Sequence, residues 1–277
     1  MMRDKKQVVE FTRTIWNGND YLPEVWDSWI TDYDGQLITA ELGGRAIGVI
    51  KLSRLASRQW WMEGLRVDPL HRKMGIGYRL FDYILEEWRV RHNGPIRFIT
   101  NSENFSIHNF AQRSGFLKVG EYSHFESSAL EKTGLHFECM VESEAADAMA
   151  FYVKLADHTL LGSYLDAGWA YCTIDESIVQ EAIKRKHAWW WRDHQGLLMI
   201  FEEVDGEEKQ PFIQGIACRR NELTDLLLDY RGLCGDLGYQ KAYWSANLNL
   251  ELREYLDKAG FQRGWDKSIF LFEKQHE

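Results

Sequence analysis

Cysteine is scarce, and its spacing fits neither a metal site nor a disulfide framework. The 277 residues contain four cysteines, and no two of them form a C-x-x-C pair. Structural zinc sites and small disulfide scaffolds both need closely repeated cysteines. The sequence therefore predicts no metal ligand set, and it favours free thiols in a reducing compartment.

Long apolar runs and a leader-like N-terminus are also missing. No apolar stretch approaches the roughly 20 residues of a membrane span. Residues Met1–Gln7 carry mixed charges and contain no apolar segment of the kind found in secretory signals. We therefore expect no membrane partner and a cytoplasmic location.

Positive charge is in deficit, since 33 Lys and Arg face 42 Asp and Glu and give a formal net charge of −9. This balance argues against nucleic acid or an anionic membrane surface as the main partner. The runs Trp60-Trp61 and Trp189-Trp190-Trp191 could stack on bases. Consecutive aromatics in strands are more often core residues, and we expect these to be core. A polyanion that binds must therefore meet a local basic cluster.

Core-forming residues are abundant. Hydrophobic residues make up 45% of the chain and aromatic residues 14%, including 12 tryptophans, which is a globular composition rich in tryptophan. At about 150 residues per domain, the length allows two domains or one large one.

The first half of the chain alternates helical and strand patterns. Apolar spacing predicts helices at 8–17, 23–32, 75–91 and 104–114. Strand patterns bounded by turns fall at 37–42, 46–52, 59–67, 95–101 and 116–125. This order predicts an α/β (α+β) fold with a mixed sheet flanked by helices.

The second half repeats this plan. It predicts helices from about 143, at 178–186, at about 219–237 and at 248–259, with strands at 135–141, 188–191, 196–203, 211–219, 241–245 and 261–272. Asn104 to Gly115-Phe116 aligns without a gap on Asn249 to Gly260-Phe261, an offset of 145 residues. An internal duplication explains this match. We therefore expect two tandem domains, 1–142 and 143–277.

A strand, a loop with two glycines and a helix follow one another over residues 63–79. Free N–H groups at a helix start, with the positive end of the helix dipole behind them, make such a loop a phosphate-binding site. Gly75 and Gly77 let oxygens approach the backbone. Four basic residues surround them: Arg66, Arg72, Lys73 and Arg79. The loop lacks the Lys-Ser or Lys-Thr of a Walker loop, and Leu80 stands where a dinucleotide fingerprint has its third glycine.

The spacing R-x-x-G-x-G at Arg72–Gly77 resembles the acyl-CoA pyrophosphate loop of the GNAT superfamily of N-acyltransferases. A second motif supports the resemblance, because Asn104 at a helix start precedes Gly115-Phe116 by eleven residues. The resemblance covers residues 1–142 well and the remainder as a degraded copy. That copy passes from Cys218 into Arg219-Arg220-Asn221-Glu222 without a glycine loop.

The resemblance implies acetyl-CoA as co-substrate, bound once per chain. Backbone groups of Leu65 and Val67 would pair with the pantetheine arm. The pyrophosphate would be held by Arg72, Lys73, Met74, Gly75, Ile76, Gly77 and Tyr78, and the thiol arm would be lined by Asn104, Ile107 and Phe110. Many members carry a tyrosine acid seven residues after the Asn, where this chain has Ala111.

Acetyl transfer to an amine needs a base that removes a proton from the ammonium form. Strand alternation would put Gln59, Trp61, Glu63, Leu65 and Val67 on one face. Glu63 is then a carboxylate among apolar neighbours, and burial would raise its pKa toward neutrality. We expect Glu63 to act as the base, directly or through water, with a structural ion pair as the alternative role. His108 is the second candidate for the base.

The segment Asp20-Tyr21-Leu22-Pro23 is similar to a GNAT branch that includes histidine N-acetyltransferase-like proteins. The resemblance implies that Asp20 and Tyr21 line the acceptor pocket. The same residues also fit a simple turn between helices, with proline in the first helical turn.

The sequence thus predicts a two-domain enzyme that moves acetyl from acetyl-CoA to the amine of a small molecule, with amino acids among the candidates. A catalytically silent acyl-CoA-binding sensor or scaffold is the alternative from a different class, supported by Ala111 and the degraded second half. A protein N-acetyltransferase is the third possibility.

Overall fold

The computed structural model describes residues 2–15, 18–131, 136–206 and 208–276. They form two compact units, each considered by itself. The first unit comprises residues 1–98, 110–116 and 273–277, and the second comprises 99–109 and 117–272. The chain therefore passes between units at several points, and the division into tandem domains at residue 142 stays a prediction.

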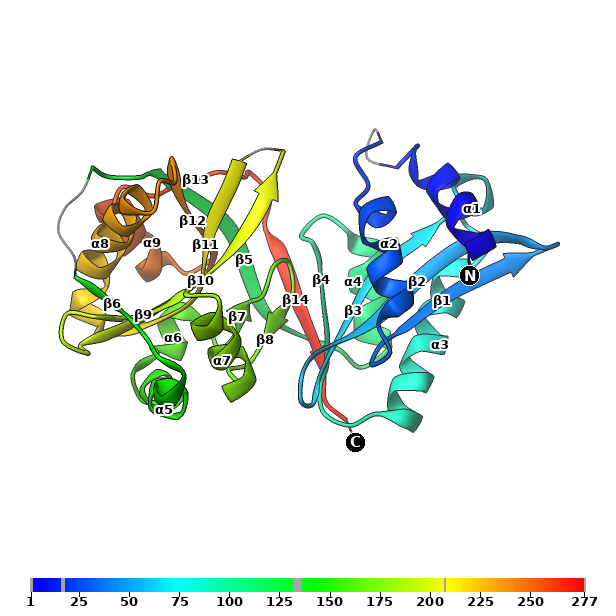
Figure 1. Ribbon diagram of the computed structural model, residues 1–277. Helices are drawn as coiled ribbons and strands as arrows, with labels where there is room; N and C mark the ends of the chain where they lie inside the picture. The colour runs from blue at the N-terminus through cyan, green and yellow to red at the C-terminus, as the bar shows by residue number, and fades with distance from the viewer. Residues whose placement is uncertain (1, 16–17, 132–135, 207, 277) are drawn as a thin grey trace. The chain divides into compact units, whose positions relative to one another are not determined.

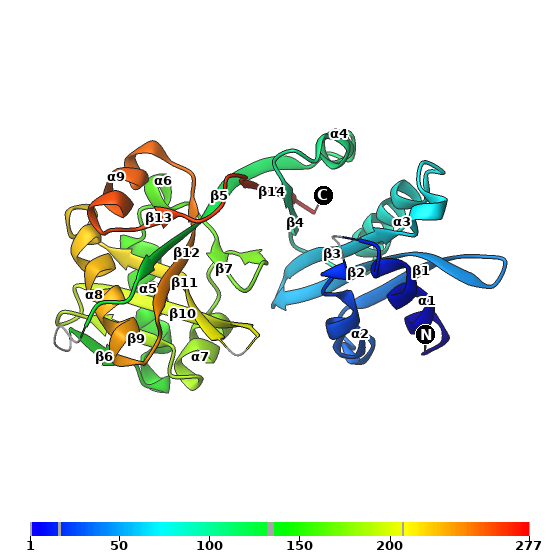
Figure 2. The same ribbon diagram turned by 90° about the horizontal axis from the view of Figure 1, so that it is seen from above.

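Strands β1 (Gln36–Leu42), β2 (Arg45–Ala56) and β3 (Gln59–Val67) form an antiparallel sheet in the first unit. The strand β4 (Ile96–Asn101) starts in this unit and pairs parallel with β3. Helices cover both faces of this sheet, as Figures 1 and 2 show. The α/β fold predicted from the sequence is confirmed for this part of the chain.

Helices α1 (Met2–Thr12) and α2 (Leu22–Thr31) cover one face of the sheet through a core that includes Trp26, Trp29 and Val49. Helix α3 (Ile76–Arg91) covers the other, where a Cβ at Gly48 would lie 2.9 Å from a methyl carbon of Leu80. Burying both faces excludes water from the strands and supplies most of the stabilisation.

The first helix begins earlier than predicted. The sequence pattern placed it at 8–17, whereas α1 starts at Met2 and ends at Thr12. The first turns of α1 contain Lys5, Lys6 and Gln7, which favour helix but add no apolar periodicity. The apolar pattern therefore did not reveal where the helix begins. Asn17, the predicted end, lies outside the described residues.

The second unit holds a mixed sheet with strand order β14-β5-β12-β11-β10-β9-β6. These strands are β14 (Ile269–Lys274), β5 (Leu117–Ser128), β12 (Lys241–Asn247), β11 (Glu208–Cys218), β10 (Gly196–Asp205), β9 (Ala188–Trp191) and β6 (Phe137–Cys139). The short strand β13 (Gln262–Arg263) also pairs with β5. The pair β11·β12 is parallel, and the pairs β12·β5, β10·β11, β9·β10 and β6·β9 are antiparallel.

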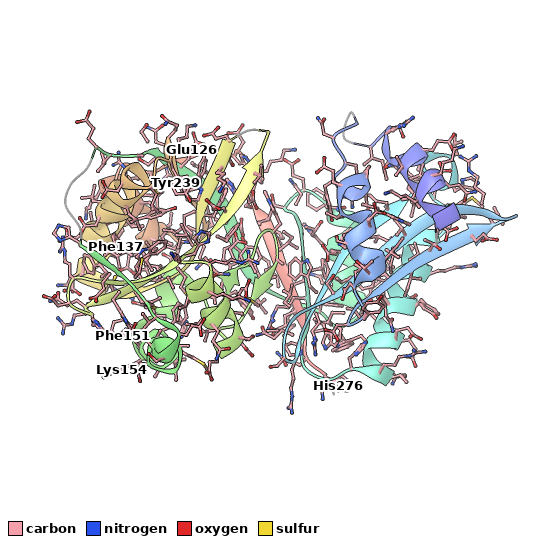
Figure 3. All side chains as sticks on the ribbon, viewed as in Figure 1. Glu126, Phe137, Phe151, Lys154, Tyr239 and His276 are labelled. Carbon is pink, nitrogen blue, oxygen red and sulfur yellow. The ribbon has the colours of Figure 1, made fainter. Side chains whose placement is uncertain are left out.

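Helices α8 (Leu223–Asp236) and α9 (Leu250–Lys258) contribute to one large core of this unit. Partly buried Phe137 and Tyr239, labelled in Figure 3, pack against it. The runs Trp60-Trp61 and Trp189-Trp190-Trp191 are buried, which confirms the prediction that they are core residues.

The remaining helices of this unit are α5 (Ala145–Leu155), α6 (His158–Leu161) and α7 (Glu176–Lys184). A two-stranded hairpin of β7 (Leu165–Asp166) and β8 (Tyr171–Cys172) follows α6. Helix α4 (Phe105–Arg113) begins in the second unit and ends in the first. Among the described helices, none combines the length and apolar character needed to cross a membrane.

Candidate functional site

A β-bulge interrupts β3 directly after Glu63. Lys51 of β2 pairs with Glu63 and Val49 pairs with Arg66, so Gly64 and Leu65 together oppose the single residue Ile50. Gly64 has φ 66°, the left-handed conformation that glycine adopts at such bulges. A Cβ at Gly64 would lie 2.4 Å from the Trp29 ring. Helix α2 therefore packs directly on the bulge.

The bulge corrects the predicted alternation along β3. The sequence put Glu63, Leu65 and Val67 on one face, which is wrong because the extra residue shifts the register. Glu63 shares its face with Arg66 on the side of α2. Val67 faces α3, where a Cβ at Gly77 would lie 3.6 Å from Val67 Cγ2.

We expect a Gly64→Ala substitution to destabilise the first unit by about 3 kcal/mol. Left-handed strain costs roughly 1–2 kcal/mol, and the collision with Trp29 adds to it. Gly43→Ala is the matched control, since Gly43 has φ 57° and a Cβ there would meet nothing within 4 Å. Urea unfolding should give a clearly larger loss for Gly64→Ala, and equal losses would contradict the packing argument.

Asp20 and Arg66 form a buried ion pair that anchors the start of α2 to β3. The Arg66 Nε–Asp20 Oδ2 distance is 2.7 Å, and Leu22 N donates to Asp20 Oδ1 at 3.1 Å. The Asp20 carboxylate is thus occupied by contacts within the protein. Tyr21 is 37% exposed, and its ring lies 5.4 Å from the Arg66 guanidinium carbon.

The half-buried carboxylate of Glu63 accepts a hydrogen bond from Ser53 Oγ at 2.6 Å. Burial raises the pKa of Glu63 above its ordinary value, while Ser53 and Lys51 oppose the rise and Asp32 adds to it. Lys51 is fully buried and paired with Asp32. Burial raises the pKa of Tyr21 to about 12, with Arg66 opposing and Glu63 adding to the rise. Glu63, Tyr21 and Arg66 therefore interact electrostatically beside the bulge.

The loop between β3 and α3 leaves the helix start open. Asp68 caps a short 3₁₀ turn (Pro69–His71) by accepting from Leu70 N at 3.0 Å. Lys73 and Gly75 both have positive φ, of 64° and 77°, so the backbone N–H groups of this loop curve around a common space. Gly75 caps α3 without any side-chain hydrogen bond, and a Cβ there would meet nothing within 4 Å.

The predicted loop residues surround this open helix start. Arg72, Lys73, Met74 and Tyr78 are exposed, and Gly75, Ile76 and Gly77 are half-buried. Such an arrangement offers unpaired N–H groups, the positive end of a helix of 16 residues and flexible cations to an anion.

The later motif is divided between the two units. Phe110 lies in the first unit, where its ring packs 4.8 Å from that of Tyr78. Asn104 and Ile107 lie in the second unit, where Asn104 Nδ2 donates to Thr100 Oγ1 at 3.0 Å. Ala111 is fully buried in the first unit.

His108 also lies in the second unit. Its Nε2 is 3.0 Å from the carbonyl oxygen of Asn101, and its ring stacks on Phe270 at 5.0 Å. Its contacts are those of a histidine held in place by a backbone acceptor and an aromatic neighbour. The two candidate bases, Glu63 and His108, therefore lie in different units.

Several neighbours of Glu63 and Arg66 were not predicted from the sequence. Ser53 and the buried Lys51–Asp32 pair were not predicted, although a lysine inside the apolar run of β2 is a visible signal. The Arg66–Asp20 pair joins residues 46 positions apart, and a single sequence gives no sign of such a pair.

The second unit has a strand, a 3₁₀ turn and a helix in the same order, at β11, Arg220–Glu222 and α8. Glu222 caps α8, and the first helical residue, Leu223, is buried in the core. A carboxylate at the cap opposes an anion. Of the two helices α3 and α8, as far as the structure describes them, α3 alone has an open start lined by glycine.

The fold and the open loop agree with the resemblance to N-acyltransferases that the sequence motifs carry. The sequence model of the "Acetyltransferase (GNAT) family" matches residues 6–116. The match covers less than half of the chain and shows that residues 6–116 are similar to this family.

Similar proteins agree with this assignment. Over 94 residues the chain is 28% identical to a histidine N-acetyltransferase of Xenopus tropicalis, a match that spans 34% of this chain and 28% of the relative. Across almost the whole chain, the fold is similar to that of a GCN5-related N-acetyltransferase from Sphaerobacter thermophilus, with TM-score 0.64, 14% identity and coverage of 99% and 93%. A tandem GNAT protein from the clavulanic acid biosynthesis pathway has TM-score 0.56 and 10% identity, with coverage of 99% and 95%. The last two matches confirm the fold class.

Proposed function

We propose that the chain transfers the acetyl group of acetyl-CoA to the amine of a small molecule, with the reacting groups in the first unit. The observation that carries the proposal is the open start of α3, which follows directly on the strand that holds Glu63. The name of the Xenopus tropicalis relative supports a small amine acceptor such as an amino acid.

Acetyl-CoA is the co-substrate in this proposal. Residues Arg72–Tyr78 hold its pyrophosphate through backbone N–H groups and cations, and the strand edge at Leu65 and Val67 pairs with the pantetheine arm. We also propose that the thiol arm of acetyl-CoA is lined by Asn104, Ile107 and Phe110. Tyr21, exposed and beside Arg66, contacts the acceptor, and Asp20 positions Arg66.

In the chemical step, the ammonium form of the acceptor loses one proton to Glu63, and the nitrogen of the resulting amine forms a bond to the acetyl carbon. The bond from that carbon to sulfur breaks, and CoA leaves as a thiolate that takes up a proton from solvent. The nitrogen then loses a second proton to solvent, and Glu63 afterwards releases its own proton to solvent. Ser53 holds one oxygen of Glu63, leaving the other for the amine or for a bridging water. A pKa raised by burial suits Glu63 to this transfer at neutral pH.

We expect acetyl-CoA to bind once per chain. Gly77→Glu should abolish binding measured by isothermal titration calorimetry, because it places a carboxylate at the second position of α3. Thr224→Glu is the matched control, since Thr224 occupies the second position of α8. Two equivalent sites, or normal binding by Gly77→Glu, would contradict the proposed site.

Turnover of acetyl-CoA with a panel of amines tests the activity itself. Binding of acetyl-CoA without turnover of any small amine or peptide would contradict the enzyme proposal and support an acyl-CoA sensor. Turnover with peptides alone would identify a protein N-acetyltransferase.

A further inference from the structure

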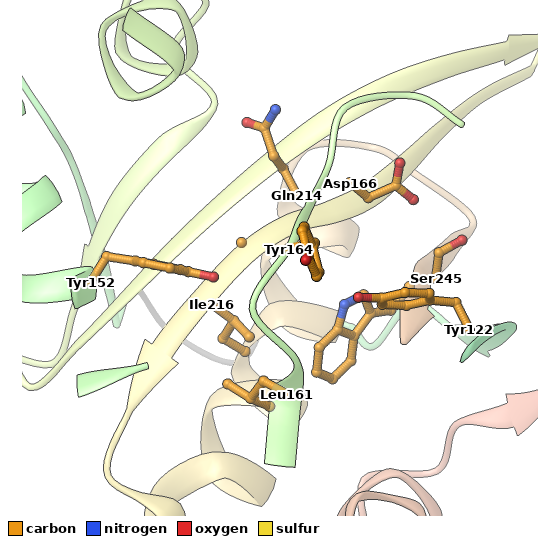
Figure 4. Close-up of a pocket in the computed structure, with 10 residues that line it drawn as sticks. Tyr122, Tyr152, Leu161, Tyr164, Asp166, Gln214, Ile216 and Ser245 are labelled. Atoms are coloured by element: carbon orange, nitrogen blue, oxygen red, sulfur yellow. The ribbon is translucent and has the colours of Figure 1, made fainter. Parts of the chain in front are cut away.

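A small polar cavity lies inside the second unit. Its lining includes Tyr122, Tyr152, Asp166, Gln214 and Ser245, and its volume is about 20 Å³. A cavity of this size holds about one water-sized group. Figure 4 shows the hydroxyls of Tyr122 and Tyr152 directed inward from opposite sides, with Asp166 and Ser245 beside Tyr122. The half-buried Tyr164 and Gln214 form the part of the lining nearest to solvent.

Asp166 gives this cavity a carboxylate that is 5% exposed. Its Oδ1 accepts from the N–H groups of Gly168 and Trp169, at 3.0 and 3.2 Å, in the turn between β7 and β8. The Trp169 ring stacks on Trp265 at 5.0 Å, which holds the turn in place. Among the described residues, none provides a cation in an ion pair with Asp166. A buried carboxylate without a cation is unfavourable.

The other polar groups of the cavity include hydroxyl and amide oxygens that can accept hydrogen bonds. The hydroxyl of Tyr152, a side chain 4% exposed, makes no hydrogen bond with a described residue. Ser245 bonds to Asp166 and lies 3.0 Å from His124 Nδ1. An ammonium group carries three donors and a positive charge in about the volume of a water molecule. It would satisfy Tyr152 and the ionised form of Asp166 together, whereas with a water molecule alone the carboxyl group of Asp166 has no counter-ion and keeps its proton at neutral pH.

We propose that this cavity binds the ammonium group of a small-molecule primary amine, with Asp166 as its counter-ion. The side chains of Tyr122, Tyr152 and Trp244 line the same space, and their low polarity strengthens the attraction between Asp166 and a cation. The site uses residues of the second unit alone, so it is a binding site additional to the acetyl-transfer site of the first unit.

The proton balance of Asp166 provides a signature of binding. Burial raises the pKa of Asp166 to about 8, and Glu203 adds to the rise. Tyr171 and Ser245 also face this carboxyl group, with Tyr122 beside Tyr171 and His124 beyond Ser245. Burial lowers the pKa of His124 to about 4, so His124 is uncharged near neutral pH. Amine binding at pH 7 therefore releases up to one proton from Asp166.

The test uses ¹³C-methylammonium with the full chain at pH 8.5, with binding followed by NMR line broadening at constant ionic strength. We expect half-saturation at or below about 30 mM, because a probe with two heavy atoms is limited to millimolar affinity. Asp166→Asn keeps the turn acceptor and should weaken binding at least tenfold. Asp175→Asn, at the cap of α7, is the matched control and should bind normally.

Additional variants distinguish this cavity from the acetyl-transfer site and from nonspecific cation binding. Glu63→Gln separates the two sites, because a loss of methylammonium binding in this variant together with normal binding by Asp166→Asn would place the probe at the acetyl-transfer site and overturn the proposal. Ser245→Ala should weaken binding several-fold and serves if Asp166→Asn fails to fold. Absence of binding up to about 100 mM, equal binding by Asp166→Asn, or full competition by tetramethylammonium would overturn the proposal.

Discussion

Glu63→Gln is expected to lower kcat/KM for acetyl transfer by at least about 100-fold at neutral pH, while acetyl-CoA binds as in the wild type. Removal of a general base typically costs 10²–10⁴ in rate. Glutamine keeps the size of the side chain and its hydrogen bond with Ser53 but cannot accept the proton. Stopped-time assays across pH, together with calorimetry for acetyl-CoA, provide the measurement.

The pH profile gives a sharper form of this expectation. Only the ionised form of Glu63 accepts a proton, so kcat/KM should rise with pH through the pKa of Glu63, which burial places above its ordinary value. This acidic limb should vanish in Glu63→Gln. Glu24→Gln, at an exposed position of α2, is the control. It should keep both the wild-type value of kcat/KM and the acidic limb of the pH profile.

Ser53→Ala tests the role of Glu63 as the base by removing its hydrogen-bond donor. The Ser53 hydrogen bond favours the ionised form of Glu63, so its loss should move the acidic limb to higher pH with a modest fall in rate. Unchanged activity of Glu63→Gln would remove Glu63 from the mechanism and direct attention to His108.

The glycine loop could be predicted from the sequence because its chemistry is local. Arg72, Gly75 and Gly77 lie next to one another at the start of a helix, so a short stretch of the sequence is enough to predict the conformation of this loop. The order of the longer strands and helices was also predicted, since apolar periodicity reports burial on each element. The short helix α6 and the β7–β8 hairpin were not predicted.

The environment of Glu63 could not be predicted in full. The bulge at Gly64 adds one residue to β3, and only the pairing with β2 reveals it. This single residue moves Arg66 onto the face of Glu63. Asp166 was not predicted for a similar reason, because its burial depends on β11 and β12, which are distant from it in sequence.

Asp166→Asn is expected to change the pH dependence of stability by on the order of 4 kcal/mol between pH 5 and pH 9. In the folded chain the pKa of Asp166 is raised from 3.8 to about 8, so the folded state binds more protons than the unfolded state between these values. Stability therefore falls as pH rises through this window and levels off above about pH 8. The asparagine variant has no such proton and should lose less stability.

The direction in which stability changes with pH distinguishes Asp166 from Asp157, an ordinary capping carboxylate in the same unit. At Asp157, although burial opposes it, hydrogen bonds from Thr159 and Arg220 hold the pKa below its ordinary value. Asp157→Asn should therefore destabilise the chain most at neutral pH and least in acid, whereas Asp166→Asn should be relatively more stable at pH 9. Urea unfolding at several pH values, with hydrogen exchange of β11 and the β7–β8 turn as the local readout, measures both. Parallel pH profiles for wild type and Asp166→Asn would mean that Asp166 is ionised in the folded protein at neutral pH, with its charge already compensated.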